Sequence, residues 1–156
     1  MQCRERLKQY LDENDVPFEL MTHRLAYTMP EVAALLHVPG KQVAKVIVVK
    51  VNGRMVMLVV PAPYRLDLGR VRALLDAQQV GLAKEEELAN LFSDCVTGAV
   101  PPFGNLYGVP VYVDLALAEE ADLVFRVGTH QHAMKVAYSD FARLAQPTVA
   151  EFAEHV

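Results

Sequence analysis

The chain has 156 residues, a length that suits one domain with a core of its own, so we expect a single domain over residues 1–156. Its 53% hydrophobic and 22% charged residues are typical of an ordinary globular protein. The formal net charge of −4 argues against a protein that coats duplex nucleic acid through a broad basic surface. It still allows a local pocket for one nucleotide end.

The two cysteines and the N-terminus bear on location. Cys3 and Cys95 are far apart in the chain and form no metal-ligand pair, so we expect no disulfide framework and a reduced, cytoplasmic location. The N-terminus carries charge at once, without the apolar run of a secretory signal. No apolar run reaches the length that spans a bilayer, so we expect no membrane partner.

The region before residue 43 predicts two helices around a short strand. Arg4 to Asn14 has apolar residues at helical spacing with charges between them, which predicts an amphipathic helix. Phe18 to His23 is expected to be a strand. Thr28 to Glu31 has the form of a capping box, with a proline where a missing N–H does no harm, and predicts a helix from Pro30 to His37.

The stretch Val43 to Val51 is the strand around which we expect the fold to be organised. It is β-branched and free of turn residues. Both of its alternating faces are mostly apolar, which predicts a central strand covered on both sides. Lys45 has apolar neighbours two residues away on either side, and a buried, unpaired ammonium is costly. Lys45 therefore either runs its stem along the sheet to water or serves a site.

The middle of the chain predicts a hairpin and two helices. Asn52-Gly53 is a two-residue turn signal, and Arg54 to Val60 is the expected antiparallel partner strand. Asp67 is expected to cap a helix that runs through Ala77. After a short apolar piece from Val80 to Ala83, Lys84 to Phe92 predicts an exposed amphipathic helix with three glutamates in its first turn.

The last third predicts further strands and two helices. The strands are expected at Gly108 to Asp114, Asp122 to Val127 and Ala133 to Tyr138. Ser139-Asp140 is expected to cap a helix that runs to Ala145, and Thr148 to His155 is interpreted as helical. Because strands and helices alternate irregularly with a tight hairpin, we expect a mixed α/β (α+β) domain.

The segment Gly98 to Gly104 is the most unusual in the chain. Pro101 and Pro102 fix φ and remove two N–H donors, while the two glycines permit conformations that side chains would block. A stiff loop of this kind could present its remaining N–H groups to a carbonyl oxygen that gains negative charge during acyl transfer. The alternative interpretation is a rigid surface turn.

Other constellations give weaker signals. His130 and His132, with His23 as a third ligand, make a poor zinc signal, and a hydrogen-bonding role for His130 at the mouth of a site is favoured. No Gly-x-Ser-x-Gly elbow, Walker motif or dinucleotide fingerprint is present. We therefore expect no metal and no cofactor.

Several of these motifs occur together in a known family. The sequence resembles the YbaK/EbsC family of trans-editing aminoacyl-tRNA deacylases, which is related to the editing domain of bacterial prolyl-tRNA synthetases. The resemblance rests on motifs in a fixed order, namely His23 to Thr28, Glu31-Val32-Ala33, His37-Val38-Pro39-Gly40, Gln42-Val43-Ala44-Lys45, Asn52-Gly53, the Gly-x-x-x-Pro loop Gly98 to Pro102 with Phe103-Gly104, Asp114 and the turn at Gly128.

The resemblance implies a mixed, largely antiparallel sheet curved into a barrel-like core, with helices outside. It also implies hydrolysis of the ester that joins a mischarged amino acid to the 3′-terminal adenosine of tRNA, by water or the 2′-hydroxyl of the tRNA. Lys45 and the backbone N–H of Gly98 would be the catalytic groups, with Pro102 stiffening the loop. The candidate substrate-binding residues are Pro102, Thr22, His23, Tyr27, Val46, Val100, Gly128 and His130.

Two positions depart from the pattern of the family. Val46 follows the lysine where many relatives carry threonine, and Val96 stands before Gly98 where close relatives often place glutamate. The implied partners are the 3′ CCA end of an aminoacyl-tRNA and a synthetase. The alternative is a non-catalytic module that binds a tRNA end, an aminoacyl-adenosine-like ligand or a synthetase. A small-molecule esterase ranks last, because no nucleophile is visible.

Overall fold

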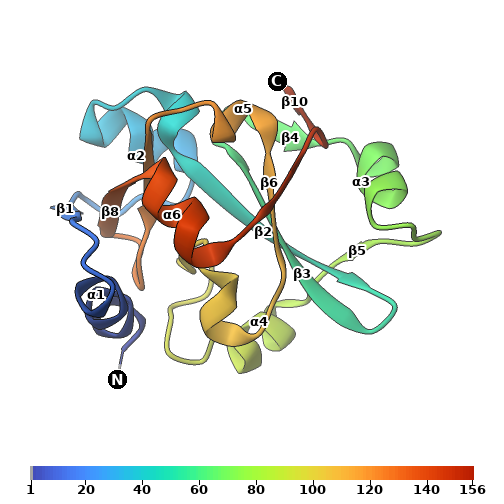
Figure 1. The fold of residues 1–156 in the computed structure, drawn as a ribbon, viewed down its shortest axis with the longest axis horizontal. Helices are drawn as coiled ribbons and strands as arrows, with labels where there is room; N and C mark the ends of the chain where they lie inside the picture. The colour runs from blue at the N-terminus through green and yellow to red at the C-terminus, as the bar shows by residue number, and fades with distance from the viewer. Residues whose placement is uncertain (1) are drawn as a thin grey trace.

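A computed structural model describes residues 2–156, and within them ten strands form three sheets with helices packed around them (Figure 1). The helices are α1 Cys3–Glu13, α2 Met29–Leu36, α3 Leu68–Leu74, α4 Glu85–Leu91, α5 Leu115–Ala118, α6 Tyr138–Ala145 and the 3-10 helices η1 Gly40–Gln42 and η2 Gly104–Tyr107. The strands are β1 Glu19–Thr22, β2 Ala44–Val51, β3 Arg54–Pro61, β4 Tyr64–Leu66, β5 Gly81–Leu82, β6 Val111–Asp114, β7 Asp122–Arg126, β8 His132–Ala137, β9 Thr148–Ala150 and β10 Ala153–His155.

The β2–β3 hairpin is the longest feature of the main sheet, and it confirms the turn prediction. The two strands pair antiparallel from Ala44 opposite Pro61 to Val51 opposite Arg54. Asn52 and Gly53 both have positive φ, 51° and 79°, as a tight two-residue turn requires. The hairpin runs diagonally across Figure 1 and carries the predicted lysine strand.

Strand β3, rather than β2, is the central strand of the five-stranded sheet, whose order is β5-β2-β3-β6-β9. β5 pairs with β2 only at Val49 and Lys50, and Val43, just before β2, makes an isolated bridge with Val124 of β7. The stretch of β2 between these contacts, which holds Lys45 and Val46, therefore pairs with β3 alone within residues 2–156. β2 lies inside the sheet, as predicted for a central strand, but the prediction did not foresee that the stretch around Lys45 pairs with one strand only. The apolar pattern predicts that both faces of the strand are buried, but it does not tell which strands pair with its two edges.

The remaining strands form a three-stranded antiparallel sheet, β1-β8-β7, and a two-stranded one, β10-β4. The largest apolar core packs α1, α6 and four buried phenylalanines against the two larger sheets, including Phe103, Phe125 and Phe141, where the ring of Phe103 meets those of the other two edge to face. This mixed, largely antiparallel architecture confirms the predicted fold class. The sheets do not close into a barrel, so the barrel-like core implied by the resemblance is a set of separate sheets around shared cores.

The end of the chain differs from the prediction. Residues 148–155 form β9 and β10 instead of a helix, because β9 pairs parallel with β6 and β10 pairs antiparallel with β4. The buried carboxylate of Asp114 accepts hydrogen bonds from the N–H groups of Phe152 and Ala153 at 3.0 and 3.1 Å and holds the segment between these strands. Helix α6 begins at Tyr138, one residue before the predicted Ser139 cap, and has no side-chain cap.

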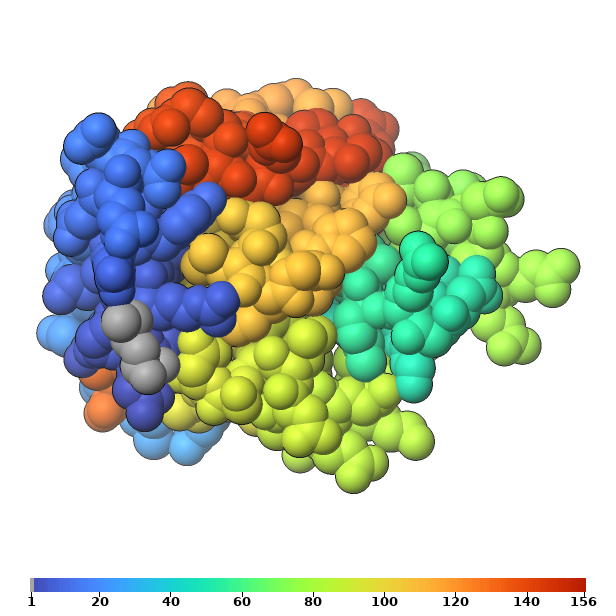
Figure 2. Space-filling view, turned by 60° about the horizontal axis from the view of Figure 1, so that its bottom comes forward, coloured from blue at the N-terminus to red at the C-terminus, as the bar shows by residue number. Residues whose placement is uncertain are grey.

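Cys3 and Cys95 form a disulfide, with their Cα atoms 5.1 Å apart, so the prediction of unpaired cysteines was wrong. A separation of 92 residues in sequence hides the fact that α1 packs beside the segment that precedes the Gly98 loop. Figure 2 shows the N-terminal segment in blue directly against the segment near residue 100 in yellow. The N–H of Cys3 also donates to the carbonyl of Asp94 at 2.9 Å.

A search of the described residues for a helix that is both long and apolar enough to span a membrane finds none.

Candidate active site

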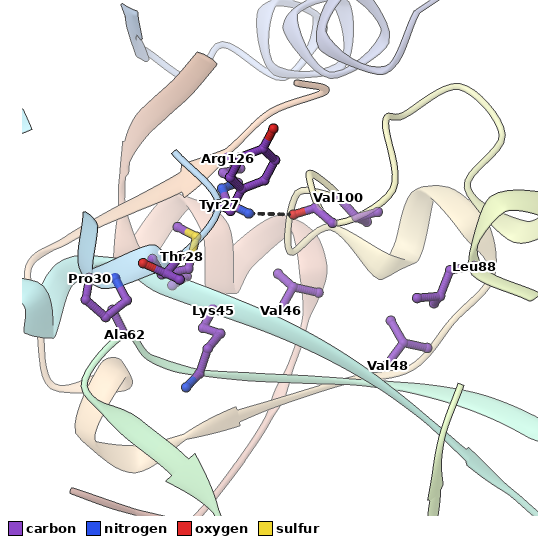
Figure 3. Close-up of a pocket in the computed structure, with 13 residues that line it drawn as sticks. Tyr27, Thr28, Pro30, Lys45, Val46, Val48, Ala62, Leu88, Val100 and Arg126 are labelled. Atoms are coloured by element: carbon purple, nitrogen blue, oxygen red, sulfur yellow. Dashed lines mark hydrogen bonds between the residues drawn. The ribbon is translucent and has the colours of Figure 1, made fainter. Parts of the chain in front are cut away.

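A cavity of about 470 Å³ lies between the open side of β2 and the Gly98 loop (Figure 3). One wall is the strand from Ala44 to Val48, and the opposite wall is formed by Gly98 and Val100, with Arg126 of β7 behind them. The segment from Tyr27 to Pro30, which opens α2, closes one end, and Leu88 of α4 lines the other. The cavity therefore sits where the main sheet lacks a neighbouring strand.

The backbone of Val46 faces this gap. On the outer side of β2, the carbonyl of Val48 accepts from the N–H of Ala83 at 3.0 Å, whereas on the β3 side the carbonyl of Val43 accepts from Ala62 at 2.8 Å. Because backbone groups alternate along a strand, the N–H and carbonyl of Val46 point to the same side as those of Val48. No strand pairs there within residues 2–156, so these groups are available to a ligand.

Lys45 lines the same cavity, but its ammonium is directed elsewhere. Its Nζ donates a hydrogen bond to the carbonyl of Tyr64 in β4. Figure 3 shows the lysine pointing away from the side of β2 where Val46 meets the loop. Burial lowers the pKa of Lys45, because desolvation disfavours the charged form. The lysine is therefore a partly desolvated cation on a flexible stem at the edge of the cavity.

Gly98 adopts a backbone conformation that favours glycine. Its φ is +87°, and a Cβ at this position would lie 3.2 Å from Cε1 of His130. Its N–H makes no hydrogen bond within residues 2–156. The predicted donor is thus unpaired, as an oxyanion-type donor must be before substrate binds.

His130 orients this donor. Its Nε2 lies 3.1 Å from the carbonyl oxygen of Thr97, and since a carbonyl only accepts, Nε2 carries the proton. The Thr97–Gly98 peptide is planar and trans, so holding the Thr97 carbonyl turns the Gly98 N–H in the opposite direction. Burial is the main cause that lowers the pKa of His130, and the nearby Arg126 lowers it further, which favours the neutral ring.

Arg126 braces the two walls of the cavity. One guanidinium nitrogen donates to the carbonyl of Gly98 and another to the carbonyl of Ala26, each at 3.1 Å, and Figure 3 marks the first of these bonds. The residue is only 6% exposed, and its Nε has no partner within the described chain. Burial lowers its pKa, opposed by the charge of Glu31. A buried guanidinium thus fixes the loop against the segment that carries Tyr27.

Comparison with known proteins shows the family of the chain. Residues 23–144 match the family model of the aminoacyl-tRNA editing domain. The chain belongs to this family. A proline–tRNA ligase of Desulfovibrio desulfuricans is 31% identical to the editing domain over 125 residues, which cover 79% of this chain and 21% of the ligase. The chain therefore spans about a fifth of the length of that curated relative.

Solved structures share the fold of this editing domain. A hypothetical protein superposes with a TM-score of 0.85 at 22% identity, over 96% of this chain and 99% of its own. A candidate trans-editing enzyme for prolyl tRNA synthetase superposes with a TM-score of 0.84 at 22% identity, over 99% and 98% of the two chains. At this level of identity the likeness establishes the fold alone.

Five of the predicted site residues of the editing domain line the cavity, namely Tyr27, Lys45, Val46, Gly98 and Val100. His130 lies just behind, with its ring centroid 5.2 Å from that of Tyr27. The others support the walls from outside. Gly128 donates its N–H to the carbonyl of Ala99 at 2.8 Å, and Pro102 is a buried residue of the loop itself.

Thr22 and His23, which were also predicted to bind substrate, are not among the described residues that line the cavity. Thr22 is exposed in β1 opposite His132, and Nδ1 of His23 donates to the carbonyl of Arg24 at 2.7 Å. Nδ1 of His132 is 2.5 Å from the hydroxyl of Thr129, so each of the three histidines has a separate partner. No cluster of three or more metal-ligating side chains occurs among residues 2–156.

Sequence reasoning missed Arg126, which is the most informative residue of the site. In the predicted strand Asp122 to Val127 it is the last residue but one, where an arginine is expected to reach solvent. The sequence offers one signal for a role of Arg126, namely its position between Val124-Phe125 and the turn at Gly128. This signal is weak, because the burial of the guanidinium is visible only in the structure.

Proposed function

We propose that this chain hydrolyses the ester bond of mischarged aminoacyl-tRNA, with the 3′ CCA end as substrate. The observation that carries the proposal is the unpaired N–H of Gly98, a residue whose two peptide carbonyls are held by His130 and Arg126 and which lines the same cavity as Lys45. A fixed N–H donor stabilises an ester carbonyl oxygen as it gains charge, since it needs no reorganisation during the reaction.

The chemistry needs no protein nucleophile. Water, oriented by the 2′-hydroxyl of the terminal ribose, attacks the carbonyl carbon, the bond to the 3′ oxygen breaks, and that oxygen leaves with the proton that the water gives up, so that the products are the free amino acid and the tRNA 3′-hydroxyl. Among the described residues, neither serine nor cysteine lines the cavity. The hydroxyl of Thr28 is engaged with Glu31, to whose carboxylate it donates at 2.9 Å while capping α2. Lys45 acts as a mobile cation that leaves Tyr64 to contact the ribose or its phosphate.

The aminoacyl side chain occupies the apolar end of the cavity. Val46, Val48, Leu88 and Val100 line this end, and no aspartate or glutamate lines the cavity within residues 2–156. A cationic side chain would meet Arg126 and Lys45 without a counter-charge, which costs free energy. The α-amino group of the substrate instead donates to the free carbonyl of Val46. We therefore expect small, uncharged aminoacyl groups as substrates and no turnover of lysyl-tRNA.

The test is hydrolysis of alanyl-, cysteinyl-, seryl-, prolyl- and lysyl-tRNA by the wild type and by three variants. Lys45→Ala and Gly98→Ala are expected to lower kcat/KM at least about tenfold, which corresponds to about 1.4 kcal/mol. Lys50→Ala is the matched control, because Lys50 lies on the same strand and pairs with Glu87 on the surface at 2.8 Å.

Turnover of one or more uncharged groups, lost in both site variants and kept in Lys50→Ala, supports the deacylase and names its substrate. Absence of turnover across the panel by folded protein favours the alternative, a non-catalytic module that binds a tRNA end or a synthetase. The direction of the Lys45 ammonium, toward Tyr64, is the observation that keeps this alternative in view. The proposed place of action is the cytoplasm, where tRNA is charged.

A further inference from the structure

The most exposed aromatic side chain of the site is Tyr27. The residue is 66% exposed at the mouth of the cavity, although large apolar surfaces are normally buried. Tyr27 is also the one aromatic residue that lines this cavity in the described chain. An exposed aromatic ring at the mouth of a cavity needs an explanation beyond packing.

The backbone on either side of Tyr27 is held firmly. The carbonyl of Ala26 accepts from the guanidinium of Arg126 at 3.1 Å, and Thr28 is the N-cap of α2. The ring itself lies beside His130, with centroids 5.2 Å apart and planes inclined by 49°. Tyr27 is therefore exposed but pre-organised, which lowers the entropy lost when a ligand packs on it.

The ring and the Gly98 N–H are fixed to each other through shared supports. Arg126 holds the carbonyls of both Ala26 and Gly98, and His130 contacts both Tyr27 and the Thr97 carbonyl. A ligand whose ester carbonyl sits at Gly98 therefore meets the Tyr27 ring at a defined position at the mouth. In an aminoacylated tRNA end, the group on the other side of the ribose from the ester is the terminal base.

We propose that Tyr27 is the stacking platform for the terminal base of the tRNA acceptor end. The proposal rests on the proposed function, and it assigns the mouth of the cavity to a nucleobase and the apolar end to the aminoacyl group. Base–aromatic stacking contributes about 1–3 kcal/mol and tolerates any base, because every base has a π-face. The contact therefore acts on binding, whereas Lys45 and Gly98 act on the reacting ester.

A binding cycle with non-hydrolysable compounds tests the platform separately from catalysis. The two probes are 3′-aminoacylamido-adenosine and the same aminoacylamide on a ribose that lacks the base. Tyr27→Ala is expected to weaken binding of the adenosine compound about 5- to 150-fold and to leave the base-less compound unchanged. Tyr27→Phe keeps the ring and is expected to bind both probes as the wild type does.

The matched control is Leu25→Ala, because Leu25 is 52% exposed two residues away and does not line the cavity. We expect this variant to bind both probes normally, and a cytidine analogue to bind the wild type within about tenfold of adenosine. With aminoacyl-tRNA, Tyr27→Ala raises KM and leaves kcat unchanged.

Equal weakening of both probes by Tyr27→Ala, or no weakening of either, overturns the stacking assignment. Failure of the adenosine compound to bind the wild type overturns it as well. If the wild type shows the expected cycle but hydrolyses no aminoacyl-tRNA, the platform stands and the deacylase proposal fails, so the two results are distinguishable.

Discussion

At the scale of single residues, the site depends on a buried cation that pairs with no carboxylate within residues 2–156. Arg126 places its guanidinium between two carbonyls, whose partial charges offset only part of the cost of removing a full charge from water. Lysine cannot replace this geometry, since a single ammonium lacks the planar fork that reaches two acceptors. The residue is therefore expected to serve the position of the Gly98 loop more than stability.

The variant Arg126→Met tests this positioning role. It removes two charged hydrogen bonds, worth about 1.5–3 kcal/mol each, together with the desolvation cost of the charge. We expect the free energy of unfolding to change by less than about 2 kcal/mol, while kcat falls about tenfold or more because the loop loses its restraint. Unfolding by urea and single-turnover hydrolysis measure the two quantities.

Two further observations separate positioning from a general structural effect. Amide hydrogen exchange at Ala99 and Val100 is expected to accelerate in Arg126→Met, and Arg126→Lys is expected not to rescue kcat. Unchanged exchange together with unchanged kcat would contradict the brace. Arg54→Met is the control, because Arg54 is exposed at the far end of the hairpin.

His130 makes stability depend on pH. Burial and Arg126 lower its pKa below the usual 6.5, so the folded state favours the neutral ring more than the unfolded state does. The stabilising effect is complete above about pH 6.5 and is lost as pH falls through the folded pKa. We therefore compare the free energy of unfolding of the wild type with that of His130→Gln. The advantage of the wild type is expected to be largest above pH 6.5 and smaller at pH 5.

Urea unfolding of both proteins at several pH values measures this difference. The pKa of His132 is also lowered by burial, but His132 titrates in both proteins and cancels in the difference. The glutamine amide can still donate to Thr97, so the comparison isolates the charge of the ring. A difference that is constant between pH 5 and 8 would sink the assignment.

At the scale of elements, local signals were reliable and distant pairings were not. Thr28 accepts from the N–H of Glu31 and Asp67 from that of Arg70, so two of the three predicted helix caps are confirmed, and the exception is the cap at Ser139. A cap or a tight turn is decided within four residues, and the sequence displays all of them. Part of the site could therefore be predicted as well, because Tyr27 and Pro30 lie on either side of the correctly predicted start of a helix.

Residues 148–155 show why the remainder could not be predicted. Their alternation is too short to separate helix from strand, and their partners β6 and β4 lie 34 residues or more away in sequence. Asp114 decides the matter, because its carboxylate caps α5 through Ala116 and also binds the N–H groups of Phe152 and Ala153. The sequence shows the aspartate but not the three donors that converge on it.

At the scale of the whole molecule, the N-terminal helix is fastened to the segment that leads into the Gly98 loop. The disulfide joins Cys3 to Cys95, and beside it Arg6 pairs with Asp94 at 3.4 Å and lies 4.6 Å above the ring of Tyr107. The loop itself is held from the other side, where Val96 donates to Gly128 and Gly128 to Ala99. The Gly98 loop is thus held by backbone hydrogen bonds that are separate from the covalent link, although the Gly128 turn lies against Cys3.

Reduction of the disulfide is therefore expected to lower the stability of the protein but to leave its activity nearly unchanged. A link across 92 residues restricts the unfolded chain strongly, and a disulfide of this span contributes about 2–5 kcal/mol. We expect dithiothreitol to lower the free energy of unfolding of the wild type by that amount and to leave a Cys3→Ser/Cys95→Ser variant unchanged. Since the bonds from Val96 and Gly128 persist, hydrolysis at 25 °C is expected to stay within about twofold. A large loss of activity in reduced but folded protein would show that the link, and not the turn at Gly128, sets the loop.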